Sequence, residues 1–214
     1  MRAFVLLLLA APAAAASAAP YELSVGSSVR GLPGADPVTA DDLSGGGVGL
    51  GRRLELELPA HLELWTEASS LWSGANGAMF QTLTTRVFDL TLTAGAHVRY
   101  HALRNLAVSG ALAIGYQHAS LSIEDTMGHT ASDTAWGPVA RASVQLDVLA
   151  VDRPAFALGL RGELGYLAAA GIAMTPTERR TDSSDTLHIP MQEASVGHLD
   201  LGGPFFTISV LSQF

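Results

Sequence analysis

The sequence predicts an all-β fold: an eight-stranded antiparallel up-and-down transmembrane β-barrel, with short turns at one end and long loops at the other. Three observations predict it. Apolar residues recur with a period of two in eight segments of about ten residues, as in β-strands. The connections between segments alternate between short and long. The large aromatic residues of the apolar face lie at segment ends.

Residues 1–18 differ from the rest and are predicted to be a cleaved secretory signal peptide. Arg2 gives a positive start, residues 4–11 form an apolar run, and Ala16-Ser17-Ala18 provides the small residues of a cleavage site. The run is too short to span a bilayer as a helix. We therefore expect an exported chain with one domain, residues 19–214.

The composition narrows the possible partners and cofactors. Without Arg2 the chain has 11 basic and 20 acidic residues, a net charge of −9, which argues against binding nucleic acid. All its basic residues are Arg. It has no Cys, which excludes disulfides and thiolate metal sites. No later stretch reaches the roughly 20 apolar residues of a spanning helix.

In each segment the apolar residues share one face of the predicted strand. The first four faces carry Tyr21, Leu23, Val25, Val29; Val48, Leu50, Leu54, Leu56, Leu58; Leu62, Leu64, Ala68, Trp72; and Phe88, Leu90, Leu92, Ala94, Val98, Tyr100. The last four carry Leu106, Val108, Leu112, Ile114, Tyr116; Trp136, Ala140, Val144, Leu146, Val148; Phe156, Leu158, Leu160, Leu164, Tyr166; and Phe206, Ile208, Val210, Phe214. The opposite faces are small and polar, with scattered charges.

The connections set the expected orientation. Short ones fall near residues 59–61, 101–105 and 150–154, and long ones near 30–45, 73–84, 120–134 and 170–195. Membrane barrels of bacteria have short periplasmic turns and long extracellular loops. An even strand number then places both ends of the barrel on the periplasmic side.

Aromatic residues indicate which face meets lipid. Five lie beside the long loops (Trp72, Phe88, Tyr116, Trp136, Tyr166) and four at the short-turn ends (Tyr21, Tyr100, Phe156, Phe214). Such rings prefer the headgroup zones of a bilayer, whereas a soluble barrel has no reason to sort them by height. We therefore expect the apolar face outside, as a belt between two aromatic girdles, and the polar face in the lumen.

The last segment, residues 206–214, alternates and ends on Phe214. It resembles the terminal β-signal of bacterial outer-membrane proteins, which the barrel-assembly machinery recognises. In architecture the whole domain resembles the small OmpA, OmpX and OmpW-type barrels. This resemblance implies residence in the bacterial outer membrane, and outer-membrane lipids and lipopolysaccharide as partners. We expect a monomer.

An eight-stranded interior is just wide enough to be filled by side chains, so charges inside it must pair. A first turn that pairs Leu58 with Leu62, together with one plausible register of the sixth and seventh strands, predicts three facing pairs: Arg53 with Glu67, Glu57 with Glu63, and Arg141 with Glu163. We expect these charges to plug the lumen. A proton or small-ion path along the acidic residues is the alternative.

Arg52 does not fit the pattern, because it has the parity of the lipid face. An arginine at the bilayer midplane costs roughly 2–4 kcal/mol. Either Arg52 lies near enough to the headgroups to snorkel, or a bulge near Gly49-Leu50-Gly51 turns it inward. We expect the bulge.

His118 and Ser120 are the only candidates for catalysis. A lipid-facing His and Ser two residues apart near the outer rim resemble lipid A deacylase, which implies an esterase acting on lipid acyl groups. Leu121 follows where that family has Asn, and no acid of matching parity lies on the sixth segment. We therefore expect no enzyme. Five further histidines lack metal-ligand spacing, so we expect no metal or cofactor: His97, His101, His129, His188 and His198.

The long loops are the expected functional surface. In the last one, Arg179 and Arg180 are candidate contacts for lipopolysaccharide phosphates. The first choice of function is a structural or surface-interaction role through these loops. The alternatives are a narrow transporter for small or hydrophobic solutes, resembling the OmpW type, and a lipid A-modifying enzyme.

Overall fold

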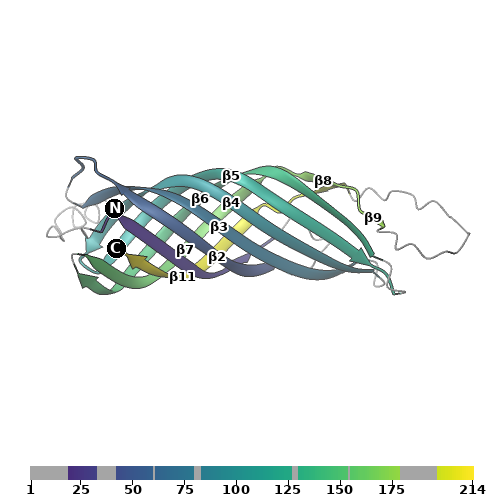
Figure 1. The fold of residues 1–214 in the computed structure, drawn as a ribbon, viewed down its shortest axis with the longest axis horizontal. Coiled ribbons are helices and arrows are strands. Elements are labelled where there is room, and N and C mark those ends of the chain that lie inside the picture. The colour runs from purple at the N-terminus through teal and green to yellow at the C-terminus, as the bar shows by residue number, and fades with distance from the viewer. Residues whose placement is uncertain are drawn as a thin grey trace, which may run out of the picture.

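The computed structural model describes residues 19–32, 42–59, 61–79, 83–126, 130–153, 155–178 and 197–214. Eight of the strands described form an antiparallel barrel (Figure 1): β1 (Tyr21–Arg30), β2 (Leu43–Leu54), β3 (Leu62–Met79), β4 (Leu83–Leu103), β5 (Leu106–Glu124), β6 (Thr130–Arg153), β7 (Phe156–Ala169) and β11 (Gly203–Gln213). Each pairs with its neighbour in the chain, and β1 pairs with β11, which closes the ring. The predicted fold class is confirmed.

Large apolar side chains cover the outside of the barrel. Leu112, Ile114 and Leu164 are each at least 65% exposed, and they share their parity with the other apolar residues of the predicted outer face. An exposed apolar surface that encircles a protein marks contact with a membrane. No helix in the described residues is long and apolar enough to cross a membrane.

The wall has two classes of strand. β1, β2, β7 and β11 have 10 to 14 residues, whereas β3, β4, β5 and β6 have 18 to 24. The longer four extend past the others at the end of the barrel opposite β1's start and β11's end (Figure 1). The parts of these four strands that lie beyond the closed ring form a sheet, which we call the raised sheet.

The raised sheet contradicts the prediction of long loops at 73–84 and 120–134. β3 and β4 stay paired until Met79 faces Leu83, and β5 and β6 until Glu124 faces Thr130. The prediction was wrong because the outward residues here are polar, so no apolar period marks the strand. They include Thr84, Arg86, Ser120, Ser122, Ser132 and Thr134.

The second strand also differs from its prediction. It was expected to carry residues 48–58, but β2 ends at Leu54, and Leu56 and Leu58 lie beyond it, exposed. At its other end β2 begins earlier than expected, and the glycines at 45, 47, 49 and 51 face the lumen. The alternation is weak in this part of the sequence, because glycine has no side chain that would mark the inner face as polar. At Gly51 a Cβ atom would lie 2.5 Å from Cγ of Glu22, so this glycine makes room for a lumen carboxylate.

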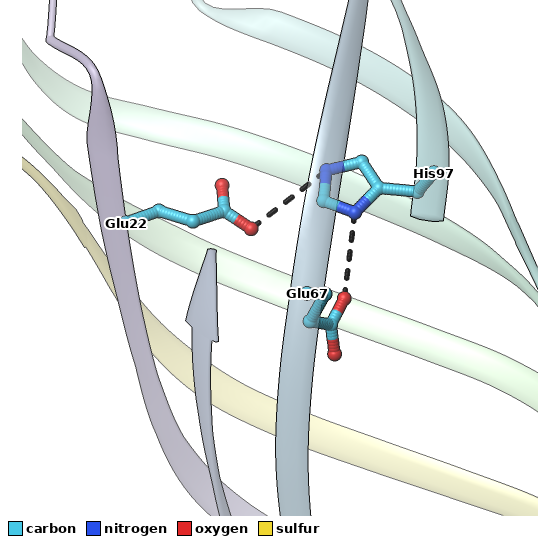
Figure 2. A group of neighbouring side chains, drawn as sticks. All are labelled: Glu22, Glu67 and His97. Atoms are coloured by element: carbon cyan, nitrogen blue, oxygen red, sulfur yellow. Dashed lines mark ion pairs between the residues drawn. The ribbon is translucent and has the colours of Figure 1, made fainter. Parts of the chain in front are cut away.

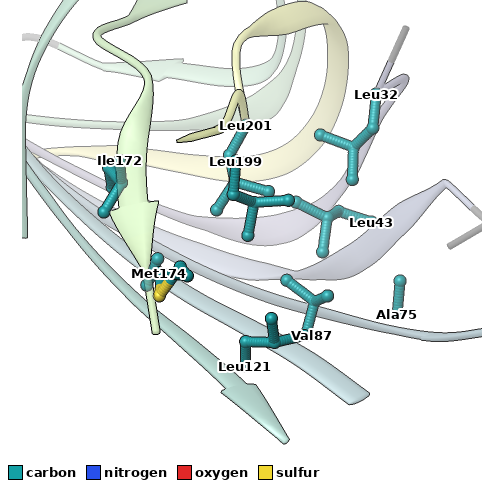
Figure 3. Packing of buried hydrophobic residues seen from close by; sticks show 10 residues of the cluster. Leu32, Leu43, Ala75, Val87, Leu121, Ile172, Met174, Leu199 and Leu201 are labelled. Carbon is teal, nitrogen blue, oxygen red and sulfur yellow. The ribbon is translucent and has the colours of Figure 1, made fainter. Parts of the chain in front are cut away.

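An apolar cluster fills the barrel at the end opposite the short turns (Figure 3). Three short strands, β8 (Ile172–Met174), β9 (Thr177–Glu178) and β10 (Gly197–Leu199), lie between β7 and β11 in the chain, and β8 pairs with β10. Side chains of β8 and β10, together with Leu201, pack against the inner faces of the long strands. We call this group the mouth cluster: Leu32, Leu43, Ala75, Val87, Ala119, Leu121, Ile172, Met174, Leu199 and Leu201.

Candidate functional site

The lumen beneath the mouth cluster is the candidate functional site, because the described strands direct charged side chains into it. Six carboxylates and five guanidiniums take part in its ion pairs: Glu22, Glu63, Glu67, Asp89, Asp147 and Glu163, with Arg30, Arg53, Arg99, Arg141 and Arg161. All but Arg53 and Glu67 are at most 7% exposed. Charges so far from water need partners.

Four of these side chains form a central cluster that joins four strands. Arg161 on β7 donates to Asp147 on β6 at 2.7 and 3.0 Å, and to Glu22 on β1 at 3.0 and 3.2 Å. Arg99 on β4 donates to the same Glu22 and lies 3.2 Å from Asp147. Each carboxylate therefore meets two guanidiniums. Loss of any one member would leave a buried charge without its full set of partners.

His97 bridges this cluster to a further carboxylate (Figure 2). Its Nε2 lies 3.7 Å from Glu22, and its Nδ1 lies 3.4 Å from Glu67 on β3. These three residues offer the ligand types of a transition-metal site, with candidate atoms within 4.8 Å of one another. However, the two carboxylates approach opposite nitrogens of one ring, and Glu22 already accepts from two arginines. The arrangement is a bridge between side chains, and we assign no metal to it.

Trp65 packs at the short-turn side of the bridge and is fully buried. Its ring stacks on His97 with centroids 6.0 Å apart and planes within 8°, and the Arg99 guanidinium lies 4.5 Å from its centroid. The indole N–H donates to Glu63 at 2.9 Å, and Arg53 donates to the same carboxylate at 3.1 Å. This group fills the lumen towards the short turns.

Arg141 and Glu163 fill the lumen on the other side of the bridge. The Nε of Arg141 donates to Glu163 at 3.2 Å, and its Nη1 donates to Ser69 at 2.9 Å. Two cavities beside this pair have volumes of about 10 and 20 Å³. Each holds about one water molecule, so side chains occupy the lumen at this level.

Arg30 connects the charged lumen to the mouth cluster. It forms an ion pair with Asp89 and donates to the hydroxyl of Ser73 at 3.3 Å. Its Nη1 donates to the backbone carbonyl of Leu201 at 3.1 Å, although the two residues lie 171 positions apart. The segment that covers the mouth is thus held from below by a buried arginine.

Comparisons with known proteins agree with this architecture. The chain matches no protein-family model and no curated protein. Among solved structures, a major outer membrane protein from Thermus thermophilus is similar, with a TM-score of 0.58 at 13% identity over 90% of this chain and 98% of that one. The fold is that of a small outer-membrane β-barrel.

Two further matches are weaker. Ail, the attachment invasion locus protein of Yersinia pestis, has a TM-score of 0.48 at 10% identity over 92% of this chain and 99% of that one. The β-domain of the Bordetella autotransporter BrkA has a TM-score of 0.42, also at 10% identity, with the same coverage.

Two of the three predicted facing pairs are wrong. Arg53 faces Trp65 rather than Glu67, and its side chain pairs with Glu63. Glu57 lies beyond the end of β2, exposed, and does not face Glu63. Both errors come from the first turn, which begins four residues earlier than the apolar pattern indicated. Hence the register inferred from Leu58 and Leu62 was displaced.

The third pair forms through a different register. Arg141 faces Leu167, and Glu163 faces Gln145. The long arginine side chain nevertheless reaches Glu163 within the lumen. Side-chain length compensates for an offset of four residues along the strand.

Arg52 also differs from its prediction. The register runs without a shift through β1, β2 and β3, so no bulge turns Arg52 inward. It faces Tyr21 and Thr66 and is exposed. The alternative, an arginine near the short-turn headgroup zone, describes its position.

His118 and Ser120 lie on β5 with outward parity, as expected. His118 faces Trp136 and packs on its ring, with centroids 4.7 Å apart. Among the described residues no carboxylate pairs with His118. Asp133, on the neighbouring strand, instead accepts from the backbone N–H groups of Thr134 and Thr175, at 2.7 and 2.6 Å. A catalytic triad is therefore not assembled by the described side chains.

The aromatic residues of the two predicted girdles face outward. All are exposed except the half-buried Tyr100. Residues 1–18, His129, Arg179, Arg180 and His188 lie outside the described residues, so the predictions on them stay predictions.

Sequence reasoning missed two lumen residues that the structure makes central, Glu22 and Trp65. Both sit between outward-facing neighbours of clear parity, Tyr21 and Leu23 for the first and Leu64 and Thr66 for the second. Strict alternation would have placed them inside. Nothing beyond this parity marks an isolated acid near a strand start, or a tryptophan away from the girdles, as central to the lumen.

Proposed function

We propose that the chain is an integral protein of a bacterial outer membrane, closed to ions and without catalytic activity, that contacts molecules at the cell surface through the raised sheet. The short turns face the periplasm. The observation that carries the proposal is the length of β3, β4, β5 and β6, together with the opposite character of their two faces above the outer girdle.

The four strands that form the raised sheet are longer than membrane crossing requires. A spanning strand needs about 9–11 residues, and these four have 18 to 24. An excess of about ten residues, at roughly 3.3 Å each and a tilt near 40°, raises the sheet by about 25 Å. Its outer face is rich in Ser and Thr, whereas its inner face is packed by the mouth cluster. A packed polar surface standing in water suits recognition of an external partner.

The filled lumen supports the absence of conduction. The mouth cluster residues are at most 8% exposed, and beneath them lie the Arg30–Asp89 pair, the Arg141–Glu163 pair and the central cluster. An ion would have to displace apolar side chains first and paired charges next. In planar bilayers we expect no discrete conductance. Regular channel steps would instead favour the narrow-transporter alternative.

Orientation is tested with epitope tags at the two ends. A tag placed within residues 127–129, between β5 and β6, should bind antibody on intact cells. A tag placed at residue 60, between β2 and β3, should bind only after the outer membrane is permeabilised. The reverse pattern would refute the proposed topology.

The surface role is tested by shortening the raised sheet without touching the belt. One variant joins Asn76 to Arg86 and Ser122 to Ser132, facing pairs in the register, through two-residue turns. It should still insert in membranes but lose ligands that the wild type binds on arrays of surface glycans and proteins. Identical binding by both barrels would contradict a role for the sheet.

A further inference from the structure

Arg52 is a cation on the lipid-facing surface of the barrel, near the periplasmic edge of the apolar belt. Among the described outward residues between the two girdles, the others are apolar or small and uncharged, except for His118 at the outer end. A cation on the lipid face is destabilising unless an anion or water compensates it. No carboxylate of the described residues pairs with Arg52. The compensating group must therefore come from the surroundings.

The position of the guanidinium indicates where that group lies. It sits 6.0 Å from the ring centroid of Tyr21, which belongs to the inner girdle. Tyr21 is itself fixed, because its backbone exchanges two hydrogen bonds of 3.0 Å with Phe214 and the two rings lie 6.2 Å apart. Girdle rings mark the headgroup zone. The Arg52 side chain thus extends towards that zone rather than into the acyl chains.

The backbone around Arg52 is equally well defined. Its carbonyl accepts a hydrogen bond from the Thr66 hydroxyl at 3.3 Å, and its strand pairs on both sides without a shift. A guanidinium presents its N–H groups in a planar fork that matches phosphate oxygens. The phenol of Tyr21, whose ring lies beside the guanidinium, carries a further donor.

We propose that Arg52 and Tyr21 form a binding site for the phosphate group of a phospholipid in the periplasm-facing leaflet. The site rests on the membrane insertion proposed above. It gives the barrel a fixed vertical position, because the phosphate anchors the short-turn end of β1 and β2 at the leaflet surface.

Native mass spectrometry of barrels released from phosphatidylglycerol nanodiscs tests the site by counting retained lipids. Arg52→Gln should lower phospholipid retention about five-fold, the net effect of losing one hydrogen-bonded contact to the phosphate. Arg104→Gln is the matched control. Arg104 is 76% exposed at a short turn and pairs with Asp152 at 3.1 Å, so its loss removes the same charge outside the belt and should leave retention unchanged.

The lipid class distinguishes phosphate from other headgroup chemistry. Retention should be similar for phosphatidylglycerol and phosphatidylcholine, which both carry the phosphate, and about five-fold lower for phosphate-free monogalactosyldiacylglycerol. Equal retention of the galactolipid, or unchanged retention in Arg52→Gln, would overturn the site while leaving the proposed function intact. Failure of the wild type to insert, seen as no folded band in unheated gel samples, would overturn the proposed function and the site together.

Discussion

The stability of the barrel should depend on Arg161 more than on most single residues. Its guanidinium donates four hydrogen bonds to Glu22 and Asp147 and is 3% exposed. Arg161→Met keeps much of the side-chain volume but leaves two buried carboxylates to share Arg99. Breaking a buried ion pair from one side costs about 3–5 kcal/mol, because the remaining charge stays out of water.

Urea unfolding of the barrel in lipid vesicles, followed by tryptophan fluorescence, measures this cost. With a slope of about 2 kcal/mol per molar urea, the midpoint should fall by about 2 M. Asp147→Asn should also destabilise the barrel. The loss of unfolding free energy in the double variant should be smaller than the sum of the two single losses, by about 2 kcal/mol or more. The reason is that Arg99 and Glu22 remain as a balanced pair.

An exposed ion pair provides the control. Arg104→Met removes the partner of Asp152 at the short-turn side and should cost no more than about 1 kcal/mol. If Arg161→Met lies within about 1 kcal/mol of the wild type, or the double variant is additive within about 0.5 kcal/mol, the central cluster does not stabilise the barrel as its contacts indicate.

Three further changes test the lumen and the mouth. Gly51→Ala should cost about 1–3 kcal/mol, because its Cβ would crowd a lumen carboxylate. Gly162→Ala is the control, since a Cβ there would meet nothing within 4 Å, and it should stay within about 0.5 kcal/mol in the same titration. Equal losses would argue against the crowding. In variants with one tryptophan each, brominated lipids should quench Trp136, which is 59% exposed, and spare Trp65, which is fully buried; equal quenching would contradict their opposite orientations. Leu201→Ala should cost about 2–4 kcal/mol and leave the barrel silent in planar bilayers, because the ion pairs beneath still fill the lumen; conductance in this variant alone would show that the mouth is the only seal.

Alternation was enough to predict the wall of the barrel. Where the outer face meets lipid, most of the alternate residues are apolar, and residues such as Leu112, Ile114 and Leu164 show this pattern in the sequence. The same rule fails beyond the outer girdle. Outward residues such as Thr84 and Ser122 face water there, so the sequence of these strands shows no apolar alternation. The raised sheet was therefore predicted as loops.

Register was harder to predict, because it depends on where each turn begins. The apolar residues Leu56 and Leu58 continue the pattern of β2 beyond its last pairing, which displaced the inferred partners of Arg53 and Glu57. Alternation alone does not reveal which lumen side chains meet across the barrel, since Glu22 and Arg161 lie 139 positions apart. The bridge at His97 has no sequence signature for the same reason.

The central cluster also has a consequence for the order of assembly. Glu22 is on the first strand, and its partners Arg99 and Arg161 are on β4 and β7, so its charge is neutralised only when the ring is nearly complete. An incomplete barrel would carry unpaired inward charges, which are costly to move into a bilayer. Closure between β1 and β11 and entry into the membrane should therefore occur together, and half-formed barrels should remain in the periplasm.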